Sequence, residues 1–137
     1  MKSLSLFLLM LVFSAVVVHS QTAGEMASNC KGVSAAKVTD QSVEIPSDTR
    51  SGICWGAFLS IQFAIRYVGH QNLDGSYSPS IKPLFSVCAR KGVDAYELVK
   101  VFVSYTDRHP ERLHKEFFQV AMESAREAFP CGQDWKP

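Results

Sequence analysis

"SGICWGAFLSIQFAIRYVG" (residues 51–69) is the stretch that decides the fold. It is longer than a typical strand, and Arg66 is its one charged residue, so the pattern predicts a helix. Gln62 and Arg66 stand four residues apart and therefore share one narrow stripe. Because the helix is apolar on nearly every other side, we expect it to be buried at the centre of the domain. Gly69 is the expected C-cap.

The segments on either side of this helix predict a short helix and two loops. "TAGEMASNC" (22–30) is compatible with a short helix that ends at its cysteine. Residues 31–50 lack periodicity and predict a loop, with extended backbone near "VEI" (43–45). Residues 70–83, "HQNLDGSYSPSIKP", are dense in turn formers and predict a second loop.

A second long helix is predicted to follow Asp94, which is a good N-cap with Glu97 three residues further on. The frequent Val and Phe in "AYELVKVFVSYTD" (95–107) leave a strand as the alternative, but the cap and the charge spacing favour a helix. At 100° per residue one broad face is apolar. That face consists of Leu98, Val99, Val101, Phe102 and Tyr105.

His109-Pro110 is expected to end that helix and to start the last one, with Pro110 in its first turn. One side of the last helix is small or apolar, and it consists of Leu113, Phe117, Val120, Ala121, Ser124, Ala125 and Ala128. With Phe118, Met122 and Phe129 the apolar arc widens to about 200°. Such an arc requires two partners, either two helices or one helix and another subunit. The predicted fold is all-α, a small bundle with a short helix and three longer helices.

The N-terminus has the pattern of a signal peptide. Met1 and Lys2 precede the apolar run 4–18, which is short for a membrane span, and small residues before Gln21 suit cleavage after Ser20. The alternative is an uncleaved membrane anchor. We therefore expect a signal peptide at 1–20 and a single exported domain at 21–137. Removing Lys2 leaves 13 basic residues, from 14, against 13 acidic ones, which predicts no nucleic-acid partner and no membrane binding after cleavage.

All four cysteines, Cys30, Cys54, Cys88 and Cys131, lie in the expected mature chain. An even number in an oxidising compartment favours two disulfides. Four cysteines allow three connectivities, and sequence spacing does not choose between them.

No residue pattern in the chain predicts catalysis, a metal site or a cofactor. His109 and His114 are five residues apart, off the four-residue spacing that places two ligands on one helix face. A cysteine nucleophile with a histidine base is the alternative, but a disulfide-bonded sulfur is not a nucleophile. Glu123 and Glu127 are interpreted as part of a solvated charged face. We expect a protein that is not an enzyme.

Three segments together resemble the Rap/Tai group of immunity proteins associated with type VI secretion. They are "GICWGAFLSIQFAI" (52–65), "VCARKGVDAYELVKVFVSYTDRHPERLH" (87–114) and "AMESAREAFPC" (121–131), and "GEMASNC" (24–30) is similar to the first helix of that family. The shared pattern includes Gly-x-Cys-x-Gly, His-Pro-Glu and a closing Ala-Phe-Pro-Cys. The chain departs from it at Ala57, where the family often has Tyr, and at Arg90, where it often has Pro.

The resemblance implies an all-helical periplasmic protein, often a homodimer, that binds and blocks a secreted peptidoglycan amidase and thereby protects the producing cell. A protruding loop is the expected inhibitory device. The candidate partner-binding residues lie in the 70–83 loop and in the turn after the second long helix, and they are Asn72, Asp74, Tyr77, Tyr105, Asp107, Arg108 and His109. The alternative is a stand-alone periplasmic binding or structural protein on the same scaffold.

The bundle topology chooses a disulfide pairing. In an up-down bundle the end of one helix lies near the start of the next, and the ends alternate. Cys30 closes the first helix and Cys54 opens the second, while Cys88 precedes the third helix and Cys131 follows the fourth. We therefore predict Cys30–Cys54 and Cys88–Cys131.

Overall fold

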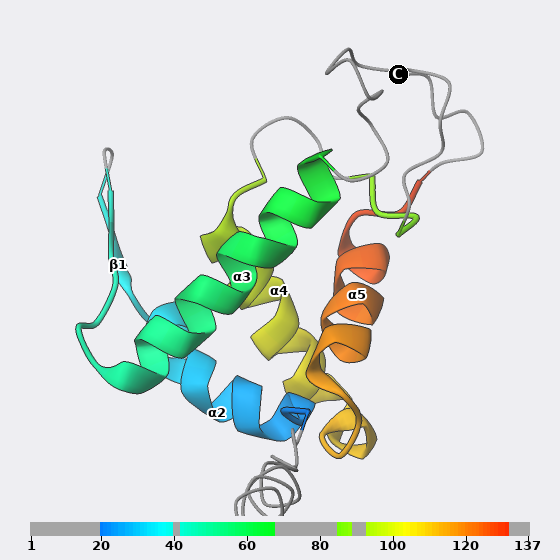
Figure 1. Ribbon diagram of the computed structural model, residues 1–137, viewed down its shortest axis with the longest axis horizontal. Helices are drawn as coiled ribbons and strands as arrows, with labels where there is room; N and C mark the ends of the chain where they lie inside the picture. Colours follow the sequence, from blue (N-terminus) through cyan, green and yellow to red (C-terminus); the bar gives the residue numbers. More distant parts are fainter. Residues whose placement is uncertain (1–19, 40–41, 68–84, 89–92, 132–137) are drawn as a thin grey trace, which may run out of the picture.

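The computed structural model of this chain describes residues 20–39, 42–67, 85–88 and 93–131. The described elements are α2 (Ala23–Ser34), β1 (Lys37–Val38), β2 (Val43–Glu44), α3 (Thr49–Tyr67), α4 (Ala95–Arg108), the 3₁₀ turn η1 (Pro110–Arg112) and α5 (Phe117–Ala128). In Figure 1, α4 lies behind α3 and beside α5, and the short β hairpin projects near the N-terminal end of α3. The all-α class predicted from the sequence is confirmed.

The first helix, α2, begins at a capping box. The Thr22 hydroxyl accepts a hydrogen bond from the Glu25 N–H, and the Glu25 carboxylate accepts one from the Thr22 N–H. The helix runs to Ser34 and so passes Cys30, where the sequence suggested that it would end. The chain then forms the antiparallel hairpin, with Val38 opposite Val43, so the extended backbone expected at 43–45 is present.

The long helix α3 forms as predicted, but the expectation that it is buried on nearly all sides is wrong. Cys54, Phe58, Ile61 and Ile65 face the core. The opposite side of the helix is exposed, and its large apolar members are Ile53, Leu59 and Phe63. The sequence cannot show this, because a buried helix and a helix with one uncovered apolar face have the same composition.

Helix α4 begins at the predicted N-cap, where the Asp94 carboxylate accepts a hydrogen bond from the Glu97 N–H at 2.8 Å. Its predicted apolar face is buried at Leu98, Val99, Phe102 and Tyr105, and Val101 is half-buried. The apolar periodicity therefore predicted the core-facing side of this helix correctly.

The last helix starts later than the sequence indicated. Pro110 opens only the short turn η1, and α5 begins at Phe117. Between them the chain pairs with the start of α2: the Ala23 and Gly24 N–H groups donate to the carbonyls at 115 and 113, and the Phe117 N–H donates to the Gln21 carbonyl. These hydrogen bonds satisfy N–H groups that the first turn of α2 leaves without an intrahelical partner, so tertiary pairing overrides local helix propensity.

The core of the bundle is held by aromatic packing and by two disulfides. The rings of Phe58, Phe102 and Phe117, from α3, α4 and α5, lie 5.4–5.6 Å apart, centroid to centroid. Cys30 bonds to Cys54 and Cys88 to Cys131, the pairing that the bundle topology predicts. Among the described helices, none is both long and apolar enough to cross a membrane.

Candidate partner-binding site

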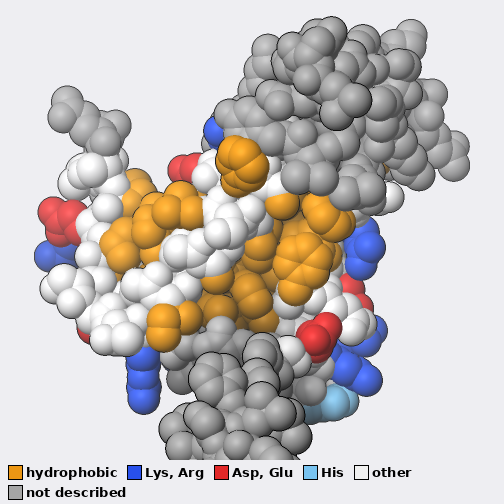
Figure 2. Space-filling model, in the orientation of Figure 1, with side chains coloured by type: hydrophobic (Ala, Val, Ile, Leu, Met, Phe, Trp, Pro, Cys, Tyr) orange, Lys and Arg blue, Asp and Glu red, His pale blue; other side chains and the backbone are white. Residues whose placement is uncertain are grey.

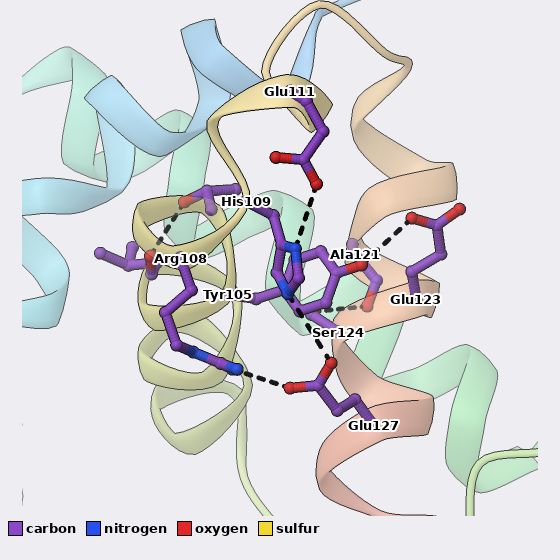
Figure 3. A network of polar contacts seen from close by, with 10 residues as sticks. Tyr105, Arg108, His109, Glu111, Ala121, Glu123, Ser124 and Glu127 are labelled. Carbon is purple, nitrogen blue, oxygen red and sulfur yellow. Dashed lines mark hydrogen bonds and ion pairs between the residues drawn. The ribbon is translucent and has the colours of Figure 1, made fainter.

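Polar side chains gather where α4 ends, η1 turns and α5 runs back alongside (Figure 3). We call this cluster the α4–α5 corner and define it by Tyr105, Arg108, His109, Glu111, Arg112, Glu123 and Glu127. The Asp94 cap and the buried stripe of α4 fix the direction in which that helix ends, and Pro110 prevents it from continuing. The residues of the corner therefore lie on three elements, the end of α4, the turn η1 and the helix α5.

Tyr105 is the buried residue of the corner, and it packs against the His109 ring. Its ring is 6% exposed, lies 4.3 Å from the His109 ring between centroids, and its hydroxyl donates to Glu123 Oε2 at 3.4 Å. Burial raises the pKa of the Tyr105 phenol, and the nearby Glu123 carboxylate raises it further. Tyr105 thus stays protonated and donates its hydrogen bond across the α4–α5 interface.

Two ion pairs cross between α4, η1 and α5. Arg108 Nη2 lies 2.8 Å from Glu127 Oε1, and Arg112 Nε lies 3.7 Å from Glu123 Oε2. The Arg108 and Glu127 side chains are 57% and 48% exposed, so their pair contributes little to folding. An exposed arginine that a carboxylate already orients is well suited to recognise an acidic or aromatic group of another protein.

The His109 side chain contacts both η1 and α5 in the same cluster. Its Nδ1 lies 3.1 Å from Glu111 Oε1, and its Nε2 lies 4.0 Å from Glu127 Oε2. The pKa of the exposed Glu111 carboxyl is lowered, first by its own backbone N–H and then by the His109 ring. Glu111 therefore keeps its charge to a lower pH than an isolated glutamate does.

The structure brings three of the predicted partner-binding residues together and leaves others apart. Tyr105, Arg108 and His109 meet in the corner (Figure 3). Asp107 is an exposed residue of α4. Tyr105 is buried, so it is a support for the corner and not itself a contact. The remaining candidates, Asn72, Asp74 and Tyr77, lie outside the described residues.

Four corner residues were not predicted from the sequence, namely Glu111, Arg112, Glu123 and Glu127. The spacing of Glu123 and Glu127 predicts a solvated face, yet the Glu123 side chain is only 19% exposed and accepts a hydrogen bond from Tyr105. The Arg108–Glu127 pair joins residues 19 positions apart on two helices, and no local pattern signals such a pair.

The described residues that flank segment 68–84 are firmly attached to the bundle. The Gln62 and Arg66 side chains both donate to the Val93 carbonyl, at 3.1 and 2.8 Å. Cys88 is bonded to Cys131, and its N–H donates to the Phe129 carbonyl at 2.9 Å. The polar stripe that the sequence shows on α3 therefore fixes the entry to α4.

The corner has the chemistry of a contact surface. An open groove of about 540 Å³ runs along α4 to Arg108 and is also lined by Lys100 and Ser104. Among the described residues no three His, Cys, Asp or Glu side chains lie close enough together to hold a metal ion. The side chains of the corner form salt bridges and hydrogen bonds with one another.

The fold is that of a small helical protein stapled by two disulfides. A family model described as "Rap1a immunity proteins" matches residues 22–131, which include every described helix and strand and all four cysteines. The chain belongs to the Rap1a immunity protein family. Searches of the curated proteins and of the solved structures found no match.

Proposed function

We propose that the chain is a periplasmic immunity protein that binds and inhibits a peptidoglycan amidase delivered by type VI secretion. The observation that carries this proposal is the family match over residues 22–131. Members of an immunity family act by binding a partner effector, and the two disulfides suit an oxidising compartment. Under this proposal residues 1–20 are a signal peptide removed after Ser20, and residues 21–137 are the mature domain, which acts as a homodimer.

The α4–α5 corner is the effector contact that we propose among the described residues. Arg108 and Asp107 are exposed, and buried Tyr105 together with the Glu127 pair holds the local backbone and side chains in place. Preorganised side chains lose little conformational entropy on binding, which favours a tight complex. Segment 68–84 is the second proposed contact, through Asn72, Asp74 and Tyr77.

Binding to a purified candidate amidase by calorimetry, combined with hydrolysis of isolated peptidoglycan, tests this proposal. The mature chain is expected to bind in defined stoichiometry and to stop hydrolysis. Arg108→Ala is expected to weaken binding by about tenfold or more, because an interface arginine is a frequent hot spot. Lys31→Ala, which removes an exposed cation from α2, is the matched control and is expected to leave binding unchanged.

Failure of the mature chain to bind or inhibit any amidase would contradict the proposed function. Unchanged binding by Arg108→Ala would instead contradict only the proposed contact. The mass of the exported protein tests the signal peptide, because cleavage after Ser20 leaves Gln21 as the first residue.

A further inference from the structure

The two disulfides differ in how far solvent reaches their cysteines. Cys30 and Cys54 are 0% exposed, and their bond joins α2 to α3 inside the core. Cys88 and Cys131 are half-buried, and their bond joins the chain before α4 to the residues that follow α5. Thiol–disulfide exchange begins when a thiolate reaches one sulfur of the bond, so access limits its rate. A thiolate in solution can therefore attack Cys88–Cys131 in the folded protein, whereas it reaches Cys30–Cys54 only when the fold opens.

The Cys88–Cys131 bond closes a small clamp between the chain before α4 and the end of α5. Val87 pairs with Pro130 in an isolated antiparallel bridge, and the Cys88 N–H donates to the Phe129 carbonyl at 2.9 Å. Figure 1 shows these two short segments side by side at the end of α5. We call this part of the chain the α5 clamp and define it by residues 85–88, residues 129–131 and the disulfide between them.

One residue of the α5 clamp has a strained backbone. Ser86 has a φ of 53°, which lies in the left-handed region that residues with a Cβ atom rarely adopt. Such a conformation persists where the surrounding contacts hold it in place. The next residue, Val87, is 2% exposed, and the disulfide follows directly at Cys88. Opening the disulfide therefore removes a covalent constraint next to a strained residue, which favours release of the whole clamp.

The α5 clamp also covers apolar surface. Val87 belongs to the hydrophobic core, and Phe85 and Phe129 pack against that core. Figure 2 shows apolar side chains gathered between α3 and α5 on this face of the molecule. Release of the clamp would expose Val87 and so add to the apolar surface that the molecule presents to solvent.

The last turns of α5 depend on the clamp for their position. Glu127 lies in the last turn of α5 and pairs with Arg108, and Glu123 accepts a hydrogen bond from Tyr105. Through these contacts α5 completes the α4–α5 corner. The rest of the bundle has its own anchors, because the buried disulfide and the three packed phenylalanine rings of the core lie outside the clamp. Release of the clamp should therefore loosen the corner and leave the other helices folded.

We propose that Cys88–Cys131 is a thiol–disulfide exchange site for dithiol reductants, and that its reduction releases the α5 clamp. One thiolate of the dithiol attacks a sulfur of the bond, which forms a mixed disulfide and expels the other cysteine as a thiolate. The second thiolate of the reductant then attacks its own sulfur in the mixed disulfide and releases the second cysteine. Two electrons and two protons pass from the dithiol to the two cysteines, and the reductant becomes a disulfide.

Differential alkylation of the purified, folded chain tests the exchange site. The chain is treated with dithiothreitol for a series of times, alkylated with iodoacetamide and mapped by mass spectrometry. Cys88 and Cys131 are expected to become alkylated at least about tenfold faster than Cys30 and Cys54, with circular dichroism unchanged. Simultaneous reduction of both bonds, earlier reduction of Cys30–Cys54, or loss of the native circular dichroism as Cys88–Cys131 opens would overturn the proposal.

A second arm distinguishes small dithiols from protein dithiols as the reductant. Thioredoxin replaces dithiothreitol, and a thioredoxin whose second active-site cysteine is replaced by serine is expected to be trapped as a mixed disulfide with Cys88 or Cys131. Selective reduction by dithiothreitol without a trapped complex would assign the site to small dithiols. Cys30→Ala/Cys54→Ala is the matched control, and it should be reduced at Cys88–Cys131 as readily as the wild type.

Hydrogen exchange of the selectively reduced chain tests the clamp itself. Amides of residues 120–129 are expected to exchange about tenfold faster or more after reduction, while those of α2 stay unchanged. Cys88→Ala/Cys131→Ala should show the same pattern without reductant. Unchanged exchange in α5 once Cys88–Cys131 is open would overturn the clamp. None of these measurements contains an effector, so their outcome is separate from a failure of the proposed function.

Discussion

Replacing the cysteines of each disulfide by serine is predicted to destabilise the fold in the order opposite to the one that loop length alone gives. Cys88–Cys131 joins residues 43 apart and Cys30–Cys54 joins residues 24 apart. In the chain-entropy model these separations correspond to about 4 and about 3.5 kcal/mol of unfolding free energy. Loop length therefore predicts a slightly larger loss when Cys88–Cys131 is removed.

Burial reverses this order. Cys30 and Cys54 are 0% exposed, whereas Cys88 and Cys131 are only half-buried. Serine at a buried position without a hydrogen-bond partner costs about 1–3 kcal/mol. The double variant Cys30→Ser/Cys54→Ser is therefore expected to lose at least about 5 kcal/mol, and Cys88→Ser/Cys131→Ser about 4 kcal/mol.

Urea unfolding of both variants and of the wild type, without reductant, measures these losses. Cys30→Ala/Cys54→Ala is the control, because alanine removes the bond without burying hydroxyl groups, and its loss should return toward about 3.5 kcal/mol. If the Cys88/Cys131 variant is the less stable of the two serine variants, the argument that the buried serines at 30 and 54 add a desolvation cost is refuted.

Three further predictions concern the packing and the charged groups. Gly24→Val should lower the free energy of unfolding by about 1–3 kcal/mol in urea melts. A Cβ at Gly24 would lie 3.2 Å from the Leu113 carbonyl oxygen, and the added methyl groups would force the two segments apart. Unchanged stability would contradict the close pairing of α2 with residues 113–117. Asp48 accepts hydrogen bonds from the Ser51 N–H and hydroxyl, and the hydroxyl bond is the main cause of the lowered pKa of Asp48. The stabilisation from these bonds is therefore present above the unfolded pKa of about 3.9 and is lost as the pH falls below that value. Asp48→Asn should therefore flatten the acid limb of the curve of stability against pH, and an acid limb identical to that of the wild type would argue against these hydrogen bonds. Glu123→Gln should lower the pKa of Tyr105 in an ultraviolet titration, and an unshifted titration would exclude the contact between the two residues. The stability of the wild type should decline once the pH rises above about 10, because the raised pKa of Tyr105 means that the folded state favours the protonated phenol.

The helices and their caps could be predicted because the signals for them are local. Asp94 and Glu97 lie within one turn of each other, and apolar periodicity along α4 assigns its buried face. The pairing Cys30–Cys54 and Cys88–Cys131 followed from the alternation of helix ends in a bundle, although α2 extends past Cys30.

What could not be predicted depends on contacts between distant segments. The delayed start of α5 results from hydrogen bonds that residues 113–117 make with the first turn of α2, more than 85 positions earlier in the chain. The corner pairs Arg108 with Glu127 through the relative placement of two helices. Which side of α3 is exposed depends on what packs against the helix, and composition does not record that.

Inhibition of a peptidoglycan amidase by the purified mature chain, residues 21–137, is the most direct test of the proposed immunity function. The measurement titrates the chain into a fixed amount of amidase and follows the release of cleaved peptides from peptidoglycan. Hydrolysis is expected to fall to zero at a defined molar ratio. Arg108→Ala is expected to shift the inhibition curve to higher concentration, and Lys31→Ala is expected to leave it unchanged. Undiminished hydrolysis at a large excess of the folded, disulfide-bonded chain, across the amidase families, would contradict that function.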